Sequence, residues 1–204
     1  MNIHFRTAKA TDFDNVVELY VNNMDLRALT KATCKSEFHS LAILNLAQDF
    51  YKANMIMVAE CKSEICGVII ATSAQTNQVA ISFDPAPRLQ KANMALKNTP
   101  QGQRILAERQ DKLTSYHHKI QEDDGNSELL LICIDKKFRR QKIGSQLIEQ
   151  YEAFLRQLGV NKYRLVSDNL CTYQYYDTNG YDCVKQEESA FNPDVTRFIY
   201  TKNV

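Results

Sequence analysis

Residues 128–159 read ELLLICIDKKFRRQKIGSQLIEQYEAFLRQLG, a continuous apolar run followed by a basic loop and then a helical pattern. The apolar run at 128–135 is typical of a strand that is buried on both faces. Apolar residues after the loop recur on one face of a helix, and Gly159 is placed to end that helix. The next segment, KYRLVSD (162–168), predicts a second strand. Strand, helix and strand together predict a right-handed βαβ unit with parallel strands.

The basic loop of this unit predicts an anion site. Arg139, Arg140 and Lys142 crowd together where the helix is expected to begin, and their mutual repulsion favours a bound anion. The first-turn N–H groups of a helix lack intrahelical partners, and the helix dipole favours negative charge there. A diphosphate is the expected guest, held by charge-assisted hydrogen bonds. The alternative is a solvated basic turn flanking Asp135, and this stretch alone does not decide between the two.

The segments on either side of this unit complete the predicted fold. Before it, the sequence predicts a strand, two helices and a β-hairpin, at residues 3–8, from Thr11 or Asp12 to about Tyr20, at about 35–52, and at 55–61 with 64–73. After it, a short helix and an antiparallel pair of strands are expected at residues 171–178, 181–188 and 195–202. This order describes an α/β (α+β) fold, with a mixed, mostly antiparallel sheet and helices on both faces.

A helical insertion of about residues 84–126 is expected between the third and fourth strands. Its apolar stripe is sparse, consisting of Ile105, Leu106, Leu113, Tyr116 and Ile120. Such a stripe could not build a core alone, so residues 1–204 are expected to form one domain that includes the insertion. The same sparseness suggests a lightly packed lid over the acceptor side of a site.

The composition of the whole chain excludes several classes of function. The formal net charge of +1 over 204 residues gives no overall field that would attract nucleic acid or an anionic membrane. No stretch approaches the roughly 18 apolar residues of a membrane span, and the first residues lack the apolar core of a signal peptide. The six cysteines form no CxxC pair and lie at no metal-like spacing to the four histidines. We therefore expect a cytoplasmic protein without a metal.

The loop Arg139-Arg140-Gln141-Lys142-Ile143-Gly144 resembles motif A, R/Q-x-x-G-x-G/A, of the GNAT superfamily of acetyl-CoA-dependent N-acyltransferases. In that family the loop amides hold the pyrophosphate of coenzyme A, a role that the resemblance gives to residues 141–145. Lys142 stands where the family usually has its first glycine. A lysine can adopt helical dihedrals, so its amide is expected to serve while its side chain points away from the pyrophosphate.

A second segment strengthens the resemblance. Residues 169–176, NLCTYQYY, followed by Gly180 and Tyr181, look like the family's N…A…fYeklGF segment. Tyr176 falls where many members keep a tyrosine that protonates the leaving thiolate, and Asn169 where a side-chain amide commonly bonds the cofactor arm. The alternative for Tyr176 is an aromatic residue packed beneath the helix.

Glu128 opens the apolar strand, at the place where several protein-acetylating members carry a glutamate. There the glutamate acts as general base toward the amine, often through water. The alternative is a charged residue that only marks the end of the strand, and Asp168 is a weaker rival for the base role.

The resemblance implies an acyl-CoA N-acyltransferase that moves the acetyl group of acetyl-CoA directly to a primary amine, without a metal. The implied catalytic residues are Tyr176 and Glu128, and the implied cofactor-binding residues are Ile132, Cys133, Ile134, Arg139, Arg140, Gln141, Lys142, Ile143, Gly144, Ser145, Asn169 and Tyr176. The acceptor is an amine of a small molecule or of a protein, with no nucleic-acid or membrane partner, and a homodimer is left open. The alternative function is a non-catalytic acyl-CoA-binding sensor or interaction module.

Overall fold

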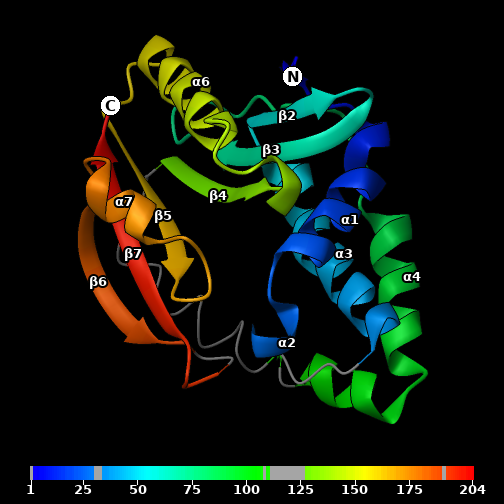
Figure 1. The fold of residues 1–204 in the computed structure, drawn as a ribbon. Coiled ribbons are helices and arrows are strands. Elements are labelled where there is room, and N and C mark those ends of the chain that lie inside the picture. The colour runs from blue at the N-terminus through cyan, green and yellow to red at the C-terminus, as the bar shows by residue number, and fades with distance from the viewer. Residues whose placement is uncertain (1, 30–33, 108, 111–126, 190–191) are drawn as a thin grey trace.

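The computed structural model describes residues 2–29, 34–107, 109–110, 127–189 and 192–204. Within them, seven strands form one sheet in the order β1-β2-β3-β4-β5-β7-β6 (Figure 1). The strands are β1 His4–Thr7, β2 Met55–Cys61, β3 Glu64–Thr72, β4 Ser127–Ile134, β5 Lys162–Asp168, β6 Asp182–Glu188 and β7 Thr196–Asn203. β4 and β5 pair in parallel, and all other neighbours pair in antiparallel fashion. The predicted mixed, mostly antiparallel sheet is confirmed.

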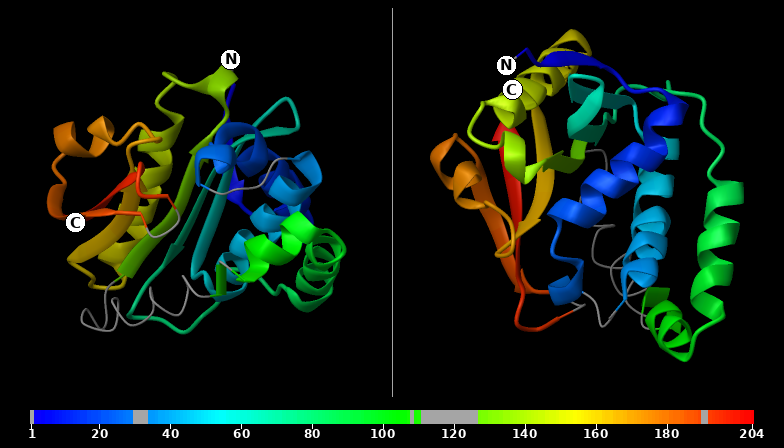
Figure 2. Two further views of the ribbon diagram at one scale, coloured as in Figure 1. Left: turned by 90° about the horizontal axis from the view of Figure 1, so that it is seen from below. Right: turned by 45° about the vertical axis from the view of Figure 1, so that its right-hand side comes forward.

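Helices cover both faces of the sheet, as Figure 2 shows. The α-helices are α1 Phe13–Asn23, α2 Leu26–Leu29, α3 Lys35–Lys52, α4 Ala86–Lys97, α6 Ile143–Gln157 and α7 Gln174–Thr178, with 3-10 turns η1 Ala10–Asp12 and η2 Lys136–Phe138. α1 and α3 share one apolar core with β2 and β3, centred on Phe13 and Phe50. α6 packs on the other face, in a core that includes Tyr151 and Tyr163. None of the helices in the described ranges combines the length and the apolar character needed to cross a bilayer.

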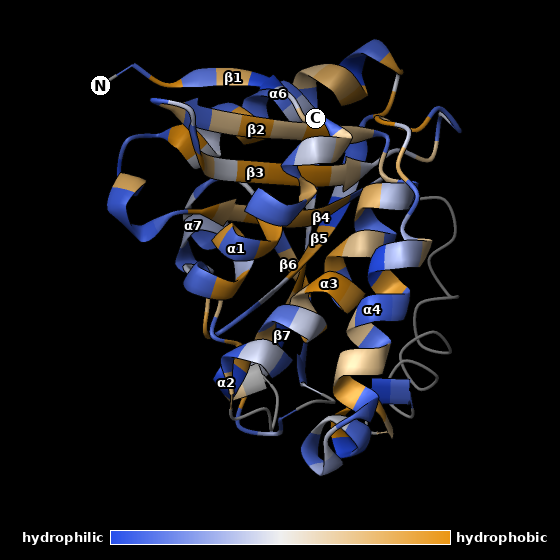
Figure 3. Cartoon of the chain, turned by 90° about the vertical axis from the view of Figure 1, so that its right-hand side faces the viewer, coloured by the Kyte–Doolittle hydropathy of each residue, from blue (hydrophilic) through white to orange (hydrophobic). Residues whose placement is uncertain are grey.

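The described part of the insertion is helical and lies between β3 and β4, as predicted. It packs more tightly than a light lid, because Ala92, Leu96 and Ile105 are buried against Leu41 and Leu44 of α3. Figure 3 shows α4 alongside α3, with polar residues on much of its outer surface. The expectation of a lightly packed lid is therefore wrong for these residues. Leu113, Tyr116 and Ile120 of the predicted stripe lie outside the described residues.

The site is positioned by the divergence of β4 from β5 (Figure 1). Their parallel pairing runs from Ser127 opposite Tyr163 to Leu129 opposite Leu165, and pairs no later residues. Just beyond this point β4 carries a bulge, since β3 pairs with Leu129 and Leu131 but passes over Leu130. A bulge bends its strand and increases the local twist. The bent β4 therefore leaves β5, and β5 pairs with no residue of β4 beyond Leu129.

Candidate active site

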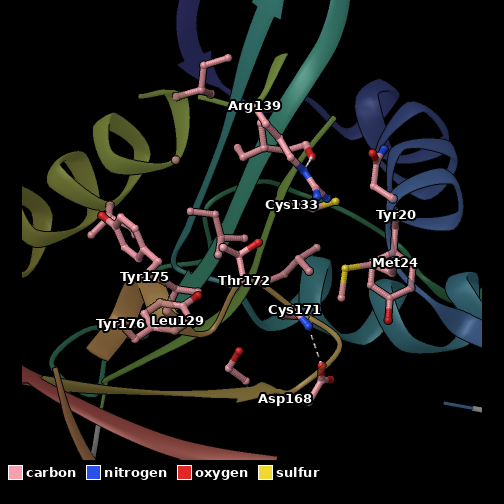
Figure 4. Close-up of a pocket in the computed structure, with 18 of the residues that line it drawn as sticks. Tyr20, Met24, Leu129, Cys133, Arg139, Asp168, Cys171, Thr172, Tyr175 and Tyr176 are labelled. Carbon is pink, nitrogen blue, oxygen red and sulfur yellow. Dashed lines mark hydrogen bonds between the residues drawn. The ribbon is translucent and has the colours of Figure 1, made fainter. Parts of the chain in front are cut away.

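A cavity of about 790 Å³ occupies the gap between β4 and β5. Its wall includes residues 129–134 of β4, residues 166–168 of β5 and residues 143–145 at the start of α6. Residues of α1 and α3 complete the wall from the other face of the sheet. Figure 4 shows Tyr175 and Tyr176 on one side of the cavity, and Tyr20 and Met24 on the opposite side. The cavity therefore reaches from the α6 face of the sheet to the α1–α3 face.

The basic loop contributes side chains to the wall of this cavity. Arg139, Arg140 and Lys142 are exposed and belong to its wall. η2 precedes them, and its start is capped by the Asp135 carboxylate, which accepts a hydrogen bond of 2.8 Å from the amide of Lys137. Three cations at the start of a helix, beside its free first-turn amides, supply the charge and the donors that an anion site requires.

The backbone of this loop differs from the expectation for Lys142. Lys142 has φ 59° and ψ 16°, and Arg140 has φ 64°, so both lie in the left-handed region. The expected helical dihedrals are therefore wrong. The chain must turn sharply between η2 and α6, and a left-handed residue makes that turn directly before Ile143. The glycine that the family usually has at this place would adopt the same conformation without a steric cost.

The position of the start of α6 also depends on Gly67 of β3, a residue that the sequence did not single out. A Cβ built on Gly67 of β3 would come within 2.9 Å of Ile134 Cδ1 and 3.1 Å of Ile143 Cγ2. The missing side chain therefore lets the first residue of α6 sit close against the sheet. By contrast, a Cβ on Gly144 would meet Ile132 and Ile134 at 3.7 Å, an ordinary contact.

The predicted acid, Tyr176, lies in the wall of the cavity and is only 8% exposed. Its ring packs edge-on against Tyr175 and Tyr181, with centroids 5.6 Å and 5.0 Å away. Burial raises the pKa of Tyr176 well above its ordinary value, so the phenol keeps its proton at neutral pH. The hydroxyl of Tyr175 donates to Ser145 Oγ at 3.3 Å and so connects α7 to the start of α6. Tyr176 thus has features of both interpretations given above, the proton donor and the packed aromatic residue, because it lies among aromatic rings and also lines the cavity.

Three predicted residues are absent from the described wall: Glu128, Gln141 and Asn169. Glu128 pairs with Arg164 of β5, whose Nη2 lies 3.2 Å from Oε2 of the glutamate. The side-chain oxygen of Asn169 accepts a hydrogen bond from the amide of Thr196. The predicted residues Ile132, Cys133, Ile134, Arg139, Arg140, Lys142, Ile143, Gly144, Ser145 and Tyr176 do line the cavity. Asp168, the rival for the base role, also lines it.

The sequence did not single out Tyr20, Leu46 and Asp49, which line the wall from α1 and α3. Burial raises the pKa of the Asp49 carboxyl group. In the sequence Asp49 is one polar residue of an amphipathic helix, and no local signal separates it from a solvated one. Among the described residues, no three His, Cys, Asp or Glu side chains gather as metal ligands.

Solved structures of the same fold cover essentially the whole chain. The PaiA N-acetyltransferase of Thermoplasma acidophilum, in complex with coenzyme A, superposes with a TM-score of 0.59 at 15% identity over 100% of both chains. The polyamine N-acetyltransferase of Drosophila melanogaster gives 0.61 at 11% identity over 100% of both. The arylalkylamine N-acetyltransferase 2 of Aedes aegypti gives 0.59 at 14% identity, over 100% of this chain and 99% of that one.

The sequence comparisons identify the family. No match was found among curated proteins. The family description "Acetyltransferase (GNAT) domain" matches residues 84–195, more than half of the 204-residue chain. This range contains β4, the basic loop, α6, β5 and α7, which are the elements that build the α6 side of the cavity. The chain belongs to the GNAT acetyltransferase family and is an acyl-CoA N-acyltransferase.

Proposed function

We propose that the protein transfers the acetyl group of acetyl-CoA directly to a primary amine that reaches the cavity from the α1–α3 face. One observation carries the proposal. The wall of one cavity combines three cations and helix amides at the α6 loop, an edge of β4 that no strand pairs with beyond Leu129, and an acidic residue, Asp49, on the α1–α3 side. These features suit a diphosphate, an amide-bearing arm and an amine in that order.

The basic loop and the start of α6 would take the pyrophosphate of coenzyme A. The amides of residues 143–145 and the side chains of Arg139, Arg140 and Lys142 supply the donors. From there the pantetheine arm would run along β4, pairing with the backbone of Ile132 to Ile134 in the manner of an added strand. The edge is available because β5 has already diverged.

Catalysis would rest on bringing the amine to the thioester and on moving two protons. The amine nitrogen forms a bond to the carbonyl carbon, and the carbon–sulfur bond then breaks. Tyr176 donates its proton to the departing sulfur and regains one that the nitrogen loses. Glu128, predicted as the base, lies outside the described wall and would act through water.

Direct transfer is favoured over an acyl-cysteine intermediate by the state of the two thiols in the wall. Burial raises the pKa of Cys133 and of Cys171 to about 12 each, so both are protonated at neutral pH. The thiolate is the nucleophilic form of cysteine, and the described wall holds no histidine that could generate it.

The cofactor assignment is tested by Gly144→Ala, with Glu149→Ala as the matched control. An alanine fits against Ile132 and Ile134, so the fold should tolerate Gly144→Ala with no loss of thermal stability. Gly144, Ile132 and Ile134 all line the cavity, so the added methyl group would narrow it beside the amides that are proposed to hold the pyrophosphate. We expect calorimetry to show coenzyme A binding weakened at least tenfold in Gly144→Ala. Glu149 is exposed, lies on the same helix and is absent from the wall, so its variant should bind normally.

Equal binding by the two variants would contradict the placement of the pyrophosphate. The activity itself is tested by thiol release from acetyl-CoA in the presence of a panel of amines. Binding of acetyl-CoA without release for any amine would favour the non-catalytic alternative.

A further inference from the structure

The α1–α3 side of the cavity is mostly apolar, and its polar groups are largely committed to the fold. Asn23 donates from its side chain to the Leu19 carbonyl at 2.8 Å and accepts from the amide of Lys136 at 2.9 Å. Asp25 accepts from the amide of Ala28 at 3.1 Å, at the start of α2. The remaining wall on this side includes Tyr20, Met24 and Leu46.

Asp49 is the exception. Asp49 belongs to the wall, and its side chain is 24% exposed. Its ion-pair partner Lys52, one turn along α3, is 3.1 Å away but 52% exposed. A flexible, half-solvated lysine can be displaced by a cation that the cavity holds in place.

The other charges around Asp49 come from two further elements. From the insertion, Arg109 donates to the Leu44 carbonyl at 3.2 Å and to Asn45 Oδ1 at 3.3 Å, and its positive charge favours the ionised form of Asp49. From β4, the negative charge of Glu128 opposes ionisation. Burial is the largest influence and raises the pKa of Asp49, so the net effect makes it a better proton acceptor than an ordinary aspartate.

We propose that Asp49 receives the ammonium group of the acceptor and accepts its proton, and that the acceptor is a primary amine carried on an apolar alkyl or arylalkyl body. This deepens the proposed function and rests on it. The acceptor arrives as R–NH₃⁺ and gives one proton to Asp49, which passes it to solvent. The free amine attacks the thioester carbon. The second proton leaves the nitrogen as the carbon–sulfur bond breaks, and it ends on sulfur by way of Tyr176.

The apolar character of the α1–α3 side favours an apolar monoamine over a peptide or a polyamine as the acceptor. A peptide N-terminus would bring its backbone amides against Leu46 and Met24, where they would lose water without gaining partners. A polyamine would need a second free carboxylate along the same wall. The other carboxylates of the described wall, Asp25 and Asp168, close local turns by accepting backbone N–H bonds.

In this arrangement Asp49 takes the base role that was proposed above for Glu128 through water, and Glu128 becomes a positioning residue that acts through Asp49. Its charge keeps Asp49 basic, and Arg164 holds it in place. Glu128→Gln should therefore shift the acidic limb of the kcat/KM profile toward lower pH, whereas Asp49→Asn should remove that limb.

The test uses Asp49→Asn, with Asp49→Glu as the conservative variant and Lys52→Gln as the matched control on α3. Thiol release from acetyl-CoA is measured with 2-phenylethylamine, hexylamine, spermidine and an alanine-initiated peptide. We expect the two monoamines to be the best acceptors. Asp49→Asn should lower their kcat/KM by about a hundredfold or more, Asp49→Glu should recover part of the loss, and Lys52→Gln should not lower it.

Folding and cofactor binding separate this proposal from its alternatives. The raised pKa of Asp49 means that its ionised form destabilises the fold at neutral pH, so Asp49→Asn should melt no lower than the parent protein. Its affinity for acetyl-CoA should be unchanged. The proposal is overturned if Asp49→Asn turns over either monoamine within threefold of the parent, or if spermidine or the peptide is the preferred acceptor. Absence of thiol release by the parent protein with every amine would instead overturn the proposed function itself.

Discussion

Replacing Lys142 with glycine should stabilise the protein, although the change removes a side chain from the proposed cofactor site. Lys142 sits at φ 59° and ψ 16°, where a residue with a Cβ pays roughly 1–2 kcal/mol. Glycine pays no such steric cost but loses about 0.5–1 kcal/mol more chain entropy on folding. The net gain is about 0.5–1 kcal/mol. For a chain of this size, 1 kcal/mol corresponds to roughly 2–4 °C in Tm, so we expect Lys142→Gly to raise Tm by about 1–4 °C.

The control is Lys142→Ala, because it removes the same charge while keeping the Cβ. Both variants relieve the repulsion from Arg139 and Arg140 equally, so the difference between their melting temperatures reports the backbone alone. Calorimetric scans at one pH and one salt concentration give that difference directly. If Lys142→Ala melts as high as Lys142→Gly, the gain comes from charge removal and the argument from backbone strain fails.

Three further perturbations address other parts of the molecule. Tyr176→Phe keeps the ring packing but removes the proton donor, so kcat should fall tenfold or more at unchanged cofactor affinity, and normal turnover would refute the acid role. Leu96→Ala should lower the free energy of unfolding by about 2–4 kcal/mol, because Leu96 of α4 is 1% exposed and packs against α3. The loss should appear as a lower denaturation midpoint, and an unchanged midpoint would support a lightly packed lid after all. Arg6 bonds both oxygens of Asp12, at 2.7 and 3.1 Å, and lowers the pKa of that carboxyl group below 3.8. A lowered pKa stabilises the fold above about pH 4 and loses that effect in stronger acid, so Asp12→Asn should lower Tm at pH 7, and the gap should close as pH falls below about 4. A gap that is constant with pH would contradict this origin.

The order of elements was predictable because each has a local signal. The apolar run at 128–135 predicted a buried strand, and the periodic residues after the loop, followed by Gly159, predicted a helix with one apolar face. The hairpin at 55–61 and 64–73 was equally plain, and the structure confirms it with a turn at Lys62 and Ser63, both at positive φ. The resemblance predicted that the basic loop and Tyr176 serve one site, and residues of both line the same cavity.

What escaped prediction depends on contacts between distant segments. The bulge at Leu130 arises from its register against β3, and a continuous apolar run carries no mark of it. Lys142 is an ordinary helix former, so its left-handed backbone follows from the sharp turn between η2 and α6 and not from its own preference. Asp49 lies about 80 residues before the strand whose cavity it lines, and only the sheet order brings the two together.

The cavity crosses the sheet, and this has a consequence for how two substrates could be held at once. Arg139 and Lys142 are exposed in the part of its wall that precedes and begins α6, and Asp25 is exposed in the part that follows α1. A cofactor held along α6 and β4, as proposed, would leave the α1–α3 part of the wall to the amine. Both substrates could then occupy the cavity together, as direct transfer requires, with no second site needed to hold the acetyl group between two half-reactions. The divergence of β4 from β5 would thus provide the room for a complex of the protein with both substrates.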